Sequence, residues 1–190
     1  MFGSLTIRDY TPADWPAVCR VHDRARPMEL LADPNLPTDH PIKTLSEVAE
    51  EEGFFKSRTA VAILNATLIG FASVDGAYLS FLYVDPGFHR RGVARALTIH
   101  VMPWVGPEGY TYASASNFPA IAFYQSIGME IACRFPGEAE GIGGQCIRLA
   151  FPTSSHRHRP GKPTSLSLQL EAQRRGVAID DLPREWPAEP

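Results

Sequence analysis

Hydrophobic and polar residues alternate with two different periods along the chain, and the change of period divides it into predicted elements. Four helices are predicted where apolar residues recur at helical spacing, over residues 11–24, 44–55, 92–104 and 119–127. Seven strands are predicted from short apolar runs at residues 5–8, 60–64, 68–74, 77–84, 110–114, 129–134 and 146–151. Hairpins mixed with crossover helices predict an α/β fold with a sheet of mixed direction.

Capping and turn residues set the predicted ends of these elements. Thr11 supplies a hydroxyl cap, Pro12 suits the first helical position and Asp14 places negative charge in the first turn. Residues 27–41 are rich in Pro, Asp and Asn, which predicts a loop after the first helix. Gly53 is expected near the end of the second helix.

The composition changes after residue 151. Residues 152–165 are polar, basic and proline-containing and are predicted to be a linker, so His156 and His158 are interpreted as solvated residues. Residues 166–190 regain periodicity and are predicted to be a partly helical extension. A faint likeness to ribbon-helix-helix segments is treated as chance. The extension is expected to pack on its own domain, residues 1–151, or on a second subunit, which makes a homodimer possible.

Composition and charge exclude several classes of partner. The chain has 190 residues, a formal net charge of −3 and a pI near 6.1, so it has no broad basic field and nucleic acid is not expected. No apolar run approaches the roughly 20 residues that span a bilayer, and no signal peptide is visible, so a cytoplasmic protein is expected. Cys19, Cys133 and Cys146 are too few and too spread for a disulfide framework or a paired-cysteine zinc site, and no metal is expected.

The most informative stretch joins the predicted strand at 77–84 to the third helix. The strand ends at Val84 and the helix opens near Gly92, with Arg90, Arg91 and Arg95 beside it. The first N–H groups of a helix are unpaired and carry the positive end of its dipole, so a pyrophosphate fits there. A plain strand-to-helix turn with a basic face is the alternative, since the spacing alone is weak evidence.

Two motifs resemble one family. Residues 89–94, His-Arg-Arg-Gly-Val-Ala, resemble the coenzyme A motif of the GCN5-related N-acetyltransferase (GNAT) family, although His89 stands where the family has Gln or Arg. Residues 117–129 resemble the family's later Asn…Phe-Tyr…Gly signature, with Met129 replacing the final aromatic residue. The resemblance covers about residues 5–151. It implies a GNAT-like (acyl-CoA N-acyltransferase) fold, a mixed central sheet with splayed strands and flanking helices.

The resemblance implies an activity and a set of site residues. The enzyme would move an acetyl group from acetyl-CoA, its acyl donor, to a primary amine of unknown identity by direct attack in a ternary complex. Tyr124 would be the catalytic acid that protonates the departing thiolate. The residues implied in cofactor binding are Leu82, Tyr83, Val84, His89, Arg90, Arg91, Gly92, Val93, Ala94, Arg95, Asn117 and Tyr124.

The general base is not assigned. The strand before the phosphate loop contains no Glu, although Tyr78 and Ser80 could hold a water there. His22, His40 and Glu29 belong to the N-terminal part that shapes the acceptor pocket in the family. Each of these three is interpreted as an ordinary surface residue, and none is named as catalytic.

Other functions are weighed against the enzyme. The main alternative is a non-catalytic acetyl-CoA-binding regulatory module, but Asn117 and Tyr124 favour the enzyme, since a sensor needs no acid. An acetyltransferase toxin acting on charged tRNA is disfavoured by the lack of strong positive charge. A cysteine acyl-enzyme is disfavoured because no Cys lies in an activating setting. The acceptor substrate is not defined by the sequence.

Overall fold

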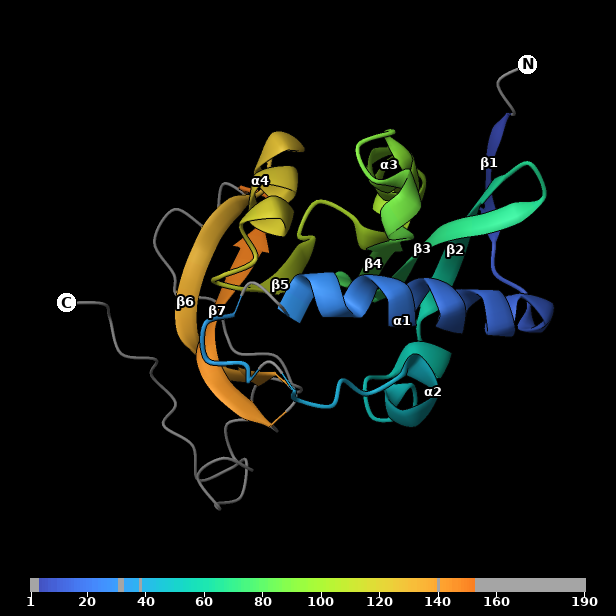
Figure 1. Cartoon of the computed structure of the whole chain (residues 1–190). Helices are drawn as coiled ribbons and strands as arrows, with labels where there is room; N and C mark the ends of the chain where they lie inside the picture. Colours follow the sequence, from blue (N-terminus) through green and yellow to red (C-terminus); the bar gives the residue numbers. More distant parts are fainter. Residues whose placement is uncertain (1–3, 31–32, 38, 140, 153–190) are drawn as a thin grey trace. The chain divides into compact units, whose positions relative to one another are not determined.

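The computed structural model describes residues 4–30, 33–37, 39–139 and 141–152 (Figure 1). The chain divides into two compact units, residues 1–111 and residues 112–190. The predicted extension at 166–190, and the predicted linker beyond Pro152, lie outside the described residues. Each unit is therefore considered by itself.

The described residues of the first unit form four antiparallel strands and three α-helices. Its α-helices are α1 (Trp15–Leu30), α2 (Leu45–Val48) and α3 (Val93–Val105), and its 3₁₀ helices are η1 (Pro12–Asp14), η2 (Phe54–Lys56) and η3 (Pro86–Phe88). Its strands are β1 (Leu5–Asp9), β2 (Arg58–Leu64), β3 (Thr67–Asp75) and β4 (Tyr78–Val84). Consecutive strands pair with one another, which confirms the predicted succession of hairpins.

The two faces of these strands are covered by different helices (Figure 1). Val18 and Val21 of α1 pack in one buried cluster with Phe71 of β3 and Phe81 of β4. On the other face, a Cβ added to Gly70 would lie 3.2 Å from Leu97 Cδ1 of α3. Because neighbouring side chains of a strand point to opposite faces, Gly70 and Phe71 mark the two sides of one buried sheet.

The second unit pairs two long strands beside a short helix. These elements are α4 (Phe118–Ser126), β6 (Glu130–Ala139) and β7 (Ile142–Ala150). Both strands are longer than predicted, because residues 135–145 contain four glycines and lack the β-branched pattern of a strand. Their pairing is antiparallel, and at Gly137 the missing side chain leaves room for Cys146 Sγ. Backbone pairing between β6 and β7, and the close approach of Cys146 to Gly137, therefore extend these strands through residues whose side-chain pattern does not predict a strand.

The strand β5 (Tyr110–Ser114) crosses the boundary between the units. It runs parallel to β4, and the two pair at their first residues, Tyr78 and Tyr110, whose rings stack at 5.3 Å. The strand order is β1-β2-β3-β4-β5-β7-β6. A mixed seven-stranded sheet with flanking helices confirms the predicted fold class.

The first helix is longer than predicted. Pro27, which was expected to open a loop, lies inside α1, and the helix continues to Leu30. Proline removes the backbone hydrogen bond to the carbonyl four residues earlier, here that of Asp23, but it sits in the last turn where little helix follows. Burial of Ala25 and Leu30 keeps this end of the helix packed.

The second helix is shorter than predicted, because it ends at Val48 rather than near Gly53. The helix α2 covers Leu45–Val48 and is followed by turns rather than by helix up to Phe55. Gly53 is left-handed, with φ 74°, and Phe54 N donates to Ala49 O at 2.8 Å. This is the Schellman arrangement that ends many helices, and it turns Phe54 into the core.

Three predictions from sequence concern disulfides, metal ligands and membrane-spanning helices. No disulfide involves Cys19, Cys133 or Cys146 in the described part of the chain, and all three side chains are half-buried. Within the described ranges no group of His, Cys, Asp and Glu is arranged to hold a metal ion. No helix of the described part of the chain is long and apolar enough to cross a membrane.

Candidate functional site

The loop between β4 and α3 begins at a fixed carboxylate. Asp85 is 8% exposed, and its backbone N donates to Ile69 O at 2.8 Å. Its Oδ1 accepts a hydrogen bond from Gly87 N at 2.9 Å, and its Oδ2 lies 3.2 Å from Arg24 Nε of α1. Asp85 therefore ties the loop to the sheet, to its own next turn and to α1.

The ring of His89 bonds within the same loop. Its Nε2 lies 2.8 Å from Val84 O, the carbonyl at the end of β4. His89 N also donates to Pro86 O at 3.3 Å. The residue that departs from the family motif thus holds the loop against the strand, and its backbone remains part of the predicted phosphate site.

Two residues of the motif have left-handed backbone. Arg90 has φ 60° and Gly92 has φ 80°. For Arg90 this conformation costs about 1–2 kcal/mol, because its Cβ approaches the following carbonyl oxygen. Strain of this kind gathers at functional sites, and left-handed residues in a turn aim successive N–H groups into an anion-binding concavity.

The first turn of α3 offers free backbone donors. The first hydrogen bond of the helix runs from Ala96 N to Gly92 O at 2.9 Å, and no side chain caps the helix. The N–H groups of Val93, Ala94 and Arg95 therefore lack an acceptor within the helix. A Cβ built on Gly92 meets no atom within 4 Å, so the backbone is open to a ligand.

Positive charge surrounds this helix start. Arg90, Arg91 and Arg95 are all exposed. The Arg91 guanidinium lies 5.4 Å from the centre of the Phe88 ring, which holds its position over the loop. Exposed arginines beside free N–H groups and the positive end of a helix dipole form an arrangement that suits a pyrophosphate.

Asn117 and Tyr124 belong to the second unit. Asn117 Oδ1 accepts from Ala120 N at 3.2 Å and caps α4. Tyr124 is 7% exposed, and its ring lies 5.4 Å from that of Phe123. The predicted site residues 82–95 thus lie in the first unit, whereas Asn117 caps α4 and Tyr124 lies on α4 in the second unit.

Two residues interpreted from sequence as ordinary surface residues make specific contacts. His22 is 1% exposed, and its Nδ1 lies 2.9 Å from Asp23 Oδ1. Glu29 accepts a hydrogen bond from Tyr83 Oη at 2.6 Å. The predicted surface position is wrong for His22, whereas the side chain of Glu29 stays 25% exposed. Glu29 reaches Tyr83 because α1 continues past residue 24. His40 lies in the loop before α2 and is partly exposed.

Burial controls the charge of His22 and Tyr83. Burial lowers the pKa of His22 below 6.5, although the Asp23 hydrogen bond acts in the opposite direction. Burial, followed by the nearby Glu29 carboxylate, raises the pKa of Tyr83 well above 10. Both side chains are therefore neutral near pH 7. Among the described residues, His22 Nε2 has no hydrogen-bond partner.

Comparisons with known proteins identify the family of the chain. A sequence profile of the Acetyltransferase (GNAT) family matches residues 20–129, more than half of the chain. The "Uncharacterized N-acetyltransferase YafP" of Escherichia coli K12 is 32% identical over 128 residues, which cover 67% of this chain and 83% of that protein. The "Peptidyl-lysine N-acetyltransferase YjaB" of the same organism is 29% identical over 83 residues, 44% of this chain and 56% of that protein.

A solved structure shows the same fold. The GCN5-related N-acetyltransferase of Rhodopseudomonas palustris superimposes with a TM-score of 0.65 at 18% identity, covering 80% of this chain and 98% of that one. The chain belongs to the acetyltransferase (GNAT) family, as the two motifs predicted. It is an acyl-CoA-dependent N-acetyltransferase.

Proposed function

We propose that the chain transfers the acetyl group of acetyl-CoA to a primary amine by direct attack in a ternary complex. The observation that carries this proposal is the uncapped start of α3 at Gly92, with free N–H groups and exposed Arg90, Arg91 and Arg95. Such a start suits the pyrophosphate of coenzyme A. The similarity to YjaB, named a peptidyl-lysine N-acetyltransferase, supports an amine as the acceptor.

The pantetheine arm would lie along β4. One edge of this strand is paired with β3, as Gly70 is with Val84. On its other edge, the pairing with β5 within the described residues is at Tyr78. Backbone groups of Leu82, Tyr83 and Val84 would then hydrogen-bond the amides of the arm, which extends the sheet like an added strand.

The reaction needs three proton transfers. The acceptor amine loses a proton and its nitrogen attacks the thioester carbonyl, so that the C–N bond forms. A backbone N–H near the end of β4 would stabilise the oxyanion. The C–S bond then breaks, the amide nitrogen gives up its second proton, and the leaving thiolate takes one proton. We assign that last donation to Tyr124 Oη.

Thermal unfolding with acetyl-CoA tests the phosphate site. At a concentration about 100 times Kd, a ligand bound only to the folded protein adds about 2.7 kcal/mol, which raises Tm by about 5–10 °C for a chain of this size. Gly92→Glu should abolish the rise, because it sets a carboxylate where the phosphates would lie.

Gly53→Glu is the matched control. Gly53 is left-handed like Gly92, with φ 74° and ψ 24° against φ 80° and ψ 2°, and a Cβ built on it also meets no atom within 4 Å. Both variants therefore carry similar backbone strain, but only Gly92 adjoins the proposed phosphate site. A full rise of Tm in Gly92→Glu would move the cofactor site elsewhere. Acetyl-CoA binding without thiol release from any amine would favour a binding module instead of an enzyme.

A further inference from the structure

Three polar side chains of α1 and β4 meet in the first unit. Tyr83 Oη donates to Glu29 Oε2 at 2.6 Å, and Arg26 Nη1 donates to the same oxygen at 2.9 Å. Arg26 Nη1 also donates to Tyr83 Oη at 3.2 Å. The side chain of Arg26 is 13% exposed and that of Glu29 is 25% exposed, so the carboxylate keeps a face toward solvent.

The helix and the strand fix this carboxylate. Arg26 and Glu29 are three residues apart, which places them on one face of α1. One turn earlier, the ring of His22 packs edge-on against Tyr83 with their centres 4.9 Å apart. Tyr83 in turn is the penultimate residue of β4. The carboxylate of Glu29 is thus held by the same strand that carries the proposed pantetheine site.

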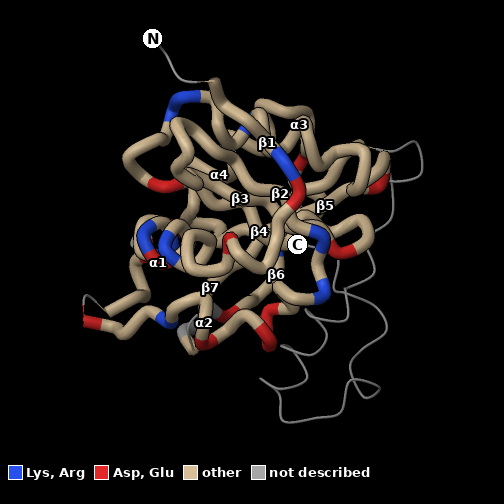
Figure 2. Tube along the Cα trace, turned by 90° about the vertical axis from the view of Figure 1, so that its right-hand side faces the viewer, with Lys and Arg blue, Asp and Glu red and all other residues tan. Residues whose placement is uncertain are grey.

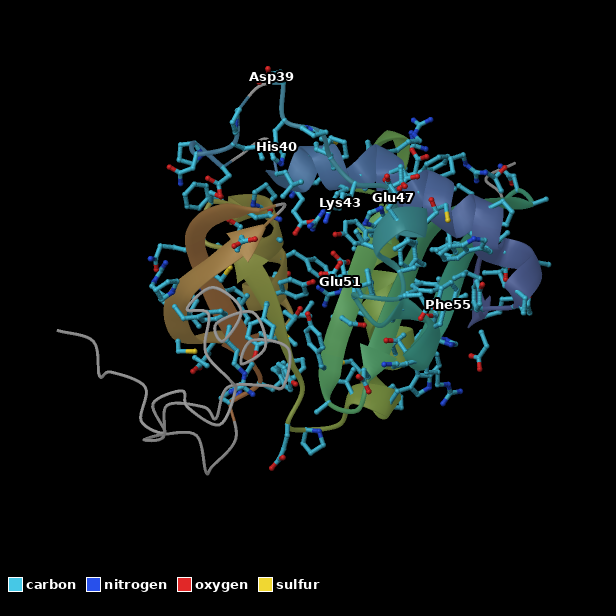
Figure 3. The ribbon with its side chains drawn as sticks, turned by 90° about the horizontal axis from the view of Figure 1, so that it is seen from below. Asp39, His40, Lys43, Glu47, Glu51 and Phe55 are labelled. Carbon is cyan, nitrogen blue, oxygen red and sulfur yellow. The ribbon has the colours of Figure 1, made fainter. Side chains whose placement is uncertain are left out.

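The cluster has an excess of negative charge. Burial acts to lower the pKa of Arg26, but Tyr83, Glu29 and Glu52 outweigh it and hold the pKa above the ordinary value. One cation therefore faces two carboxylates, while His22 and Tyr83 are neutral. Along α1 basic and acidic positions adjoin (Figure 2), and the segment after it carries Lys43 as well as Glu47 and Glu51 (Figure 3). The cluster itself, with one arginine and two carboxylates, favours a positively charged ligand.

The bonding of Glu29 leaves one oxygen available. Both hydrogen bonds go to Oε2, and Oε1 has no hydrogen-bond partner among the described residues. If Glu29 only neutralised Arg26, its carboxylate would need neither exposure to solvent nor the short hydrogen bond from Tyr83. A partly exposed carboxylate, held rigidly and next to a surplus negative charge, is suited to bind an ammonium group.

We infer that Glu29 is the specificity-determining residue for the acceptor, and that its Oε1 binds the ammonium group of a cationic primary amine. The inference rests on the proposed function, because it defines the acceptor of that reaction. Arg26 and Tyr83 act as positioning residues for the carboxylate. The substrate class is therefore an aliphatic amine that is charged near pH 7, such as a lysine side chain or a polyamine.

Calorimetric titration and steady-state kinetics test the inference. Spermidine and Nα-acetyl-lysine amide serve as cationic probes and 4-methoxyaniline as a neutral amine, with CoA present for binding and acetyl-CoA for turnover. Glu29→Gln keeps the shape and removes the charge. We expect Kd and KM for the two cations to rise about 10- to 100-fold, while kcat, and KM for the neutral amine, change much less. Added salt should weaken cation binding in the wild type more than in the variant.

Glu108→Gln is the matched control, because Glu108 is exposed in the first unit and lies after α3. It should leave every constant unchanged, and Glu29→Asp should retain much of the cation preference. If Glu29→Gln does not fold, Tyr83→Phe replaces it, with an expected loss of about 3- to 10-fold from one removed hydrogen bond.

Two results would overturn the inference. One is equal Kd and KM for the cations in the wild type and Glu29→Gln. The other is wild-type protein that binds CoA but neither cation. Failure of the proposed function is a separate result, because acetyl-CoA would then leave Tm unchanged whatever the amines do.

Discussion

His22 links the packing of α1 to pH. Its ring is buried, Nδ1 bonds Asp23, and Nε2 is unpaired within the described residues. Because burial lowers its pKa below 6.5, the folded state resists a proton that the unfolded state accepts. Of the charged groups that face it, Asp23 and Glu29 only partly offset the effect of burial on its pKa, and the positive charge of Arg26 adds to that effect. Its stabilising contribution is therefore complete above about pH 6.5 and decreases as the pH falls below that value.

We expect His22→Phe to flatten the acid side of the stability profile. Phe keeps an aromatic ring beside Tyr83 and removes the titration. At pH 7.5 the gain from deleting an unpaired buried nitrogen and the loss of the Asp23 bond oppose each other, each worth about 1 kcal/mol, so stability changes little. The free energy of unfolding, measured in urea at pH 7.5 and 5.5, checks this. His100→Gln is the control, and an acid-side loss as large in His22→Phe as in wild type would contradict the prediction.

Tyr124→Phe tests a single hydroxyl. Tyr124 is buried on α4, and Phe keeps its packing against Phe123, so stability should change little. If Tyr124 donates to the departing thiolate, turnover should fall by roughly 10²–10⁴-fold, toward the lower end because a thiolate of pKa about 8.5 leaves partly unassisted. KM for acetyl-CoA should move much less. Stopped-time thiol release at several pH values measures this, and near-normal turnover would make Tyr124 a core aromatic only.

At the scale of elements, the hydrophobic pattern predicted the strands with dense apolar runs and missed the element lengths that tertiary packing determines. The strands β2, β3 and β4 were predictable, because their apolar runs are dense and their turns are marked. The length of α1 was not, since a proline inside a helix reads as its end, whereas burial of Leu30 carries the helix on. The length of β6 and β7 was missed because backbone pairing at Gly137 leaves no side-chain signal.

The helix α1 shows how one element serves two parts of the site. Arg24 meets Asp85 at the phosphate loop, while Arg26 and Glu29 meet Tyr83 near the end of β4. The loop that we propose holds the phosphates could be singled out from its glycine and arginines, since an anion site of that kind is built from consecutive residues. The Glu29 cluster was not, because its members are joined only when α1 folds onto β4, 54 residues away in the sequence.

At the scale of the whole molecule, the remaining question is which part of the chain is needed for cofactor binding. The last residue of β7, Ala150, pairs with Glu130 of β6, and both family motifs lie before Glu130 in the sequence. A chain ending at Phe151 keeps every described strand and the start of α3. We expect acetyl-CoA to raise its Tm by the same amount as in the full chain, about 5–10 °C at 100 times Kd.

Sedimentation of the same two proteins separates binding from assembly. If residues 166–190 contact a second subunit, the full chain should sediment as a dimer and the chain ending at Phe151 as a monomer. Cofactor binding should be equal in both, because the donors at Val93, Ala94 and Arg95 belong to one short stretch of one chain. A truncated protein that has a cooperative unfolding transition but no Tm rise with acetyl-CoA would show that the cofactor site needs residues beyond 151, and that the domain predicted for residues 1–151 is drawn too short.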